Sequence, residues 1–216
     1  MNPALAGVAL AVVLGGVVAA SARNARTSVL GLVTAMVGAS FLADPLPGSL
    51  GLAARLLGSV LGGYLLWIAA RGTDARTGGS RIGWPVELLV AAAAAIIGYA
   101  SHGLGAPAAG PALAQAAGFA IAALAVAPLV NGRDILRVGI GLNLLICGTI
   151  LGRTALGGTP DALEQLVLAG LVAVLGGVVA AVAAAARSDG IGGFDLAPAP
   201  GERARRSADA HPLEPR

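Results

Sequence analysis

Seven long apolar runs divide the chain, and short polar or Gly/Pro-rich breaks separate them. A helix needs about 20 mainly apolar residues to cross the hydrocarbon core of a bilayer. The runs are close to that length, although the second is short. The pattern therefore predicts an all-α integral membrane bundle of seven transmembrane helices. Their expected ranges are Ala4–Ala20, Ser28–Ala43, Leu50–Ala70, Trp84–Ala100, Pro111–Val130, Ile135–Leu151 (or on to Leu156) and Leu163–Ala186.

The breaks between the runs have the chemistry of helix ends. The segment Asp44–Gly48 contains two prolines, which remove backbone donors and clash with the preceding turn. Residues 73–80 and 103–111 are rich in glycine, proline or polar residues. Thr159, Pro160 and Asp161 form a typical helix start, with a capping hydroxyl, proline in the first turn and an acid at the positive end of the dipole.

Composition agrees with a membrane protein. Hydrophobic residues make up 56% of the 216 residues and charged residues only 12%, whereas soluble domains average about 25% charged residues. The only cysteine, Cys147, can form no intrachain disulfide, and the two histidines, His102 and His211, lie far apart. We therefore expect no metal, haem or iron–sulfur cofactor and no catalytic site within this chain.

The basic residues are all arginines, and they alternate from one break to the next. Cytoplasmic loops are enriched in basic residues, so the arginine-rich breaks are expected on the cytoplasmic side. This predicts seven spans in the cell membrane, with the N-terminus outside and the C-terminus in the cytoplasm. The arginines expected on the cytoplasmic side are Arg23, Arg26, Arg71, Arg76, Arg81, Arg133, Arg137, Arg187, Arg203, Arg205, Arg206 and Arg216.

Three parts follow from this layout. Residues 1–106 are expected to form an N-terminal four-helix part, and residues 107–187 a three-helix part. Residues 188–216 are rich in proline, glycine, aspartate and arginine, a composition that buries little apolar surface, so a disordered cytoplasmic tail is expected. No internal repeat is evident in the sequence.

Two ionisable residues lie inside predicted spans, where charge is costly. Arg55 lies roughly 8 Å into the third span; it can snorkel towards the surface, pair structurally or belong to a proton path. Glu87 lies roughly 4–5 Å past Trp84 and can face either the headgroups or a proton path. No carboxylate is placed near the middle of any span.

Neutral polar and small residues are expected to serve helix packing. Gln115, Asn143 and Thr149 are predicted to form hydrogen bonds between helices, and His102 is interpreted as a loop histidine. The G-x-x-x-G pairs Gly58/Gly62 and Gly148/Gly152 allow helix backbones to approach closely.

The last three predicted helices carry a family resemblance. The stretch from Arg133 to Cys147 (RDILRVGIGLNLLIC) resembles the second helix of the K subunit of respiratory complex I. It is also similar to the C subunit of Mrp-type cation/proton antiporters. The stretch from Pro160 to Ala169 (PDALEQLVLA) resembles the start of the third helix of those subunits. In length and layout the whole chain is similar to the E component of hydrogenase-4 and formate hydrogenlyase-type complexes.

The resemblance implies a non-catalytic membrane-arm subunit of a group 4 [NiFe]-hydrogenase-like complex that couples redox chemistry to proton translocation. Nickel–iron and iron–sulfur centres are then expected on peripheral partner subunits, and most of the proton path on antiporter-like membrane partners. The candidate positions that the resemblance implies are Arg133 and Arg137 in the cytoplasmic loop and Asn143 within the membrane.

This sequence departs from the K-subunit pattern at two carboxylates. In the K subunit a glutamate follows Ile-Gly-Leu, whereas this chain has Asn143 at that position. The K subunit has a second glutamate in its third helix, and the corresponding position here is near Val174. Asparagine orders water but does not exchange a proton near neutral pH. Three alternatives remain open: a subunit of an Mrp-type antiporter, a subunit of complex I, or an independent small transporter.

Overall fold

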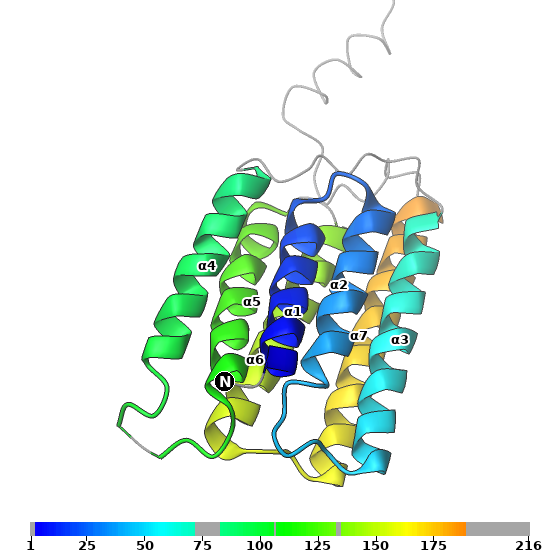
Figure 1. Ribbon diagram of the computed structural model, residues 1–216. Coiled ribbons are helices and arrows are strands. Elements are labelled where there is room, and N and C mark those ends of the chain that lie inside the picture. Colours follow the sequence, from blue (N-terminus) through cyan, green and yellow to red (C-terminus); the bar gives the residue numbers. More distant parts are fainter. Residues whose placement is uncertain (1–2, 72–82, 106, 133–134, 189–216) are drawn as a thin grey trace, which may run out of the picture.

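The computed structural model describes residues 3–71, 83–105, 107–132 and 135–188. These residues form seven helices and no strand (Figure 1). The helices are α1 (Pro3–Ser21), α2 (Ala25–Ala39), α3 (Ser49–Arg71), α4 (Trp84–Ala100), α5 (Ala112–Asn131), α6 (Ile135–Gly157) and α7 (Ala162–Ser188). The predicted disordered tail lies outside the described residues, except for its first residue, Ser188.

Five of these helices, α1, α3, α5, α6 and α7, are long and apolar enough to cross a membrane. The apolar helices α2 and α4 are shorter, with 15 and 17 residues. On the outside of the bundle, large apolar side chains stand exposed, as expected for a surface that lipid covers. Examples from four helices are Leu57, Leu89, Ile96, Val130, Leu163 and Val167.

The second helix is displaced relative to its predicted range of Ser28–Ala43. It begins earlier because the side chain of Asn24 accepts a hydrogen bond from the backbone of Arg26, at 2.9 Å, and caps the helix. It ends at Ala39, well before the two prolines of the following loop. Helix α2 has 15 residues, whereas α6 has 23.

Successive helices run in opposite directions along one common axis (Figure 1). The start of α1 and the end of α7 consequently lie at opposite ends of the bundle. Among the described arginines, Arg23, Arg26, Arg71 and Arg137 gather at the end where α7 finishes, and Arg153 lies near the other end of α6. The described part of the chain thus has the alternation that the arginine pattern predicted.

The helices can also be described as two trios of consecutive helices. Helices α1, α2 and α3 follow one another in the same order and directions as α5, α6 and α7, and α4 connects the trios (Figure 1). Each helix packs against its counterpart: α1 on α5, α2 on α6 and α3 on α7. A Val-Leu-Gly-Gly sequence recurs on helices of the same direction, at Val13–Gly16, Val60–Gly63 and Val174–Gly177.

Glycines bring the main helix pairs together. On α3, a β-carbon at Gly58 would lie 2.7 Å from the carbonyl oxygen of Ala169, and one at Gly62 would lie 3.0 Å from Val172. Gly148 of α6 makes an equally close approach to α5, but a β-carbon at Gly152 would meet nothing within 4 Å. The first predicted G-x-x-x-G pair is therefore a packing motif of α3 and α7, whereas only one member of the second pair has such a role.

Candidate functional site

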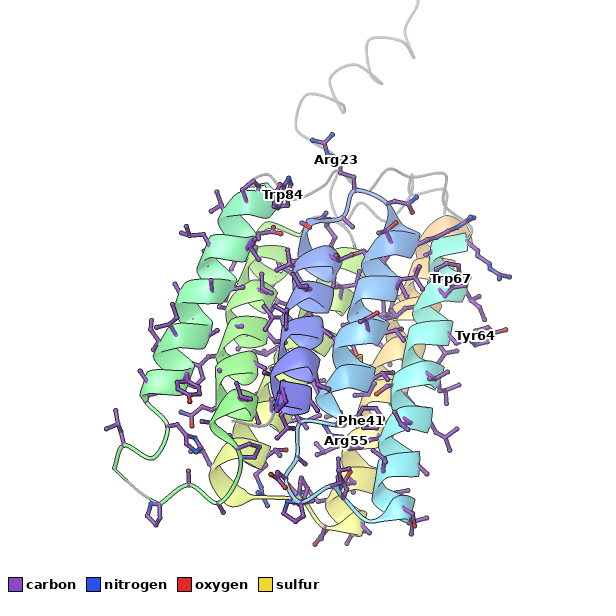
Figure 2. All side chains as sticks on the ribbon, viewed as in Figure 1. Arg23, Phe41, Arg55, Tyr64, Trp67 and Trp84 are labelled. Carbon is purple, nitrogen blue, oxygen red and sulfur yellow. The ribbon has the colours of Figure 1, made fainter. Side chains whose placement is uncertain are left out.

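The side chain of Arg55 lies inside the bundle. It projects from the first half of α3 and is 6% exposed, so it does not snorkel to the surface as one of the sequence-based alternatives proposed. Its Nη2 atom donates to the backbone oxygen of Ala39, at 3.5 Å, at the carboxyl end of α2. Figure 2 labels Arg55 in the bundle. That helix end carries partial negative charge, which offsets part of the positive charge of the guanidinium.

A small cavity lies beside Arg55, where helices α2, α3, α6 and α7 meet. Its volume is about 20 Å³, enough for one water-sized species. The Nη1 atom of Arg55 is buried and has no hydrogen-bond partner among the described residues. The cavity is lined by Arg55, Ser59 and Cys147 together with Met36, Ala39, Ile150, Leu168, Ala169 and Val172.

Helix α6 contributes Cys147 to this cavity, and Asn143 lies one turn away on the same buried face. Asn143 is 1% exposed, and its amide donates to the backbone oxygen of Gly139 in its own helix, at 2.9 Å. Thr149 likewise donates to the backbone oxygen of Ile146, at 2.8 Å. The hydrogen bonds between helices that the sequence suggested for these two residues are therefore wrong, because a backbone carbonyl of the same helix lies nearer.

Gln165 of α7 is a buried polar residue that the sequence reasoning missed. Its amide donates to the backbone oxygen of Pro160, at 3.1 Å, while its Oε1 atom has no partner in the described part of the chain. The side chain packs on Gly51, one turn before Arg55 on α3. Ser59 was missed too, although it stands one helical turn after Arg55 and so shares its face of α3.

We refer to Arg55, Ser59, Asn143, Cys147 and Gln165 as the polar seam. All five side chains are buried. They come from α3, α6 and α7, and three of them, Arg55, Ser59 and Cys147, line the same small cavity. Beyond Asn143, towards the arginine-rich end, the apolar side chains of Leu66, Leu136 and Ile140 are fully or almost fully buried. Further buried polar side chains outside the seam are Ser28, Ser40, Glu87, Gln115 and Thr154.

Glu87 occupies a different place. It lies in the first turn of α4, is 4% exposed and faces α5 rather than the headgroups. A groove of about 240 Å³ lies between these two helices, lined by Glu87 and by Val86, Val90, Ala123, Leu124, Val126, Ala127 and Val130. Because α4 lies on the flank opposite α3 (Figure 1), the structure does not bring Glu87 and Arg55 together.

Two other predicted positions lie at the bundle ends. Arg137, near the start of α6, donates through Nη2 to the backbone oxygen of Ala22, at 3.2 Å, so it joins the beginning of α6 to the end of α1. Arg133 lies outside the described residues. At the opposite end, the His102 ring contacts the side chain of Gln115, with Nδ1 and Oε1 2.8 Å apart, and fastens the loop between α4 and α5.

Within the described ranges, no group of three or more histidine, cysteine, aspartate or glutamate side chains is arranged to hold a metal ion. Comparison with protein-family models, with curated proteins and with solved structures finds no match to this chain.

Proposed function

We propose that the chain is a non-catalytic membrane-arm subunit of a redox-driven, proton-translocating complex of the hydrogenase-4 type. Its role in that complex is to hold neighbouring membrane subunits together and to line part of a hydrated path. The nickel–iron and iron–sulfur centres belong, in this proposal, to peripheral partner subunits. The observation that carries it is the central position of α6, the helix with the family-like sequence, which contributes Asn143 and Cys147 to the polar seam.

The glycines of the family-like stretch have a packing reason for being there. A β-carbon at Gly139 would lie 2.7 Å from the side chain of Val179 on α7, and one at Gly141 would lie 2.9 Å from Leu129 on α5. Small residues at these positions let α6 lie close to both neighbours. A helix held in this way presents Asn143 and Cys147 to the interior, which favours a role in lining the core.

The polar seam suits ordering of water better than transfer of protons by its own groups. Asn143 can donate and accept hydrogen bonds, but its amide does not titrate near neutral pH. The seam has no carboxylate among its five members. The proposal therefore assigns the proton-exchanging carboxylates to partner subunits and gives this chain a supporting place along the path.

The membrane topology is part of the same proposal. All seven helices cross the cell membrane, including the shorter α2 and α4, and the arginine-rich end of the bundle faces the cytoplasm. The concentration of Arg23, Arg26, Arg71 and Arg137 at one end supports this orientation, because basic residues resist translocation.

Purification of the tagged full-length chain in a gentle detergent, with mass spectrometry of the proteins that accompany it, tests the proposal. We expect antiporter-like membrane subunits together with [NiFe]- and iron–sulfur-containing proteins. Antiporter-like subunits without redox proteins would contradict the redox coupling and indicate an Mrp-type exchanger. A chain recovered alone would contradict the subunit role and indicate an independent transporter.

A further inference from the structure

The charge of Arg55 has no ionic counterpart in the described part of the chain. One ion pair there joins Arg153 to Glu164, with Nε and Oε1 3.1 Å apart. Asp161 accepts the backbone amide of Glu164, at 2.7 Å, and Asp44 lies exposed in a loop. Glu87 belongs to α4, on the other flank of the bundle. None of the described carboxylates therefore neutralises this guanidinium.

A buried charge is strongly destabilising unless an opposite charge or a set of hydrogen bonds offsets it. The carbonyl of Ala39 meets only Nη2. The Nη1 atom is buried and has no partner among the residues that the structure describes, and it belongs to a side chain that lines a cavity. The cavity is the place where a further group would complete the surroundings of the guanidinium.

We propose that this cavity binds one monatomic monovalent anion, of the halide class, as the counterion of Arg55. The volume of about 20 Å³ suits a single small ion. The hydroxyl of Ser59 and the thiol of Cys147 also line the cavity, and both can donate a hydrogen bond to an anion. A water molecule has the right size, but it would leave the positive charge uncompensated.

The site would contribute to the assembly of the bundle, because its lining comes from four helices, α2, α3, α6 and α7. Binding of the anion stabilises the folded state and not the unfolded chain, so stability rises with anion concentration. This inference is independent of the proposed redox complex, since it concerns the isolated chain.

Thermal unfolding of the purified full-length chain in detergent, in sodium chloride, bromide or gluconate at equal ionic strength, tests the site. We expect a saturable rise in Tm of about 2–4 °C in either halide over gluconate. Arg55→Gln should abolish the rise, and Ser59→Ala should move it to higher halide concentration. The control Arg71→Gln, at the exposed end of α3, should keep it.

Equal halide effects in the wild type and in Arg55→Gln would overturn the proposal, since they would reflect a general salt effect. No difference between halide and gluconate would also overturn it and indicate an internal water molecule. If Arg55→Gln does not fold, crystals of the wild-type protein grown in bromide decide the matter. An anomalous bromide peak beside Nη1 supports the site, and no peak there overturns it.

Discussion

Arg55 and Arg137 illustrate how position decides what an arginine does in this bundle. Arg137 lies near a helix end, where its guanidinium donates a hydrogen bond to the backbone oxygen of Ala22, just after α1. Its positive charge interacts favourably with the negative, carboxyl-terminal end of the α1 dipole. Arg55 lies about 9 Å from the start of α3 and is enclosed by four helices. The same type of residue therefore links two helices at the bundle end, as Arg137, and places a charge in the interior of the polar seam, as Arg55.

Asn143 provides a residue-scale test of the polar seam. If it orders water along a proton path, Asn143→Leu removes the amide and should lower redox-driven proton pumping in inverted vesicles several-fold, with the complex still assembled. Thr149→Val is the matched control, because Thr149 lies on the exposed side of the same helix and should leave pumping unchanged. Pumping at the wild-type rate in the assembled Asn143→Leu complex would exclude this role.

The sequence identified some members of the seam and not others. Arg55 and Asn143 are conspicuous because a charge and an amide interrupt long apolar runs. Gln165 lies close to a predicted helix start, where a polar residue is ordinary, and its burial depends on contact with Gly51 of another helix. Ser59 could have been found from its helical spacing to Arg55. The meeting of four helices around these two residues depends on tertiary packing, which the sequence does not reveal.

At the scale of elements, the contact between α3 and α7 is set by glycine. At Gly58 a β-carbon would overlap the backbone of Ala169, which cannot move aside as a flexible side chain can. At Gly170, on α7, a β-carbon would meet nothing within 4 Å. The two positions offer a matched pair of identical substitutions.

We expect Gly58→Ala to destabilise the bundle by about 1–3 kcal/mol through overpacking. Gly170→Ala should be neutral or stabilising by up to about 1 kcal/mol, because alanine favours the helix more than glycine does. Thermal or denaturant unfolding in detergent measures both. Equal stability of the two variants would show that α3 and α7 do not approach as closely as the structure has them.

The positions of the elements were largely predictable, because hydrophobic run length and the breaks between runs both mark helix ends. The predicted range of α4, Trp84–Ala100, agrees with the structure. The range of α2 was wrong by several residues at the carboxyl end, where Ser40 follows the last helical residue and the apolar residues 41–43 do not continue the helix. Apolar character marks burial in a membrane or core, and it does not by itself maintain helical hydrogen bonding.

At the scale of the molecule, α3 and α7 run in the same direction because successive helices alternate and three helices separate them in the chain. The loop with two prolines after α2 and the shorter turn after α6 fill corresponding places, and Thr159 donates to the backbone oxygen of Pro45 between them, at 2.6 Å. The additional helix α4 restores the direction needed for the second trio. In the proposed topology of seven crossings, the chain ends lie on opposite sides of the membrane.

Reporter fusions test this seven-span arrangement most directly. Green fluorescent protein and alkaline phosphatase would each be fused after Arg216 and, in a second pair, after Gly105 in the loop between α4 and α5. Seven spans predict fluorescence and silent phosphatase at Arg216, and active phosphatase without fluorescence at Gly105. Active phosphatase at Arg216 would place the C-terminus outside the cytoplasm and contradict both the orientation and the assignment of the arginine-rich end.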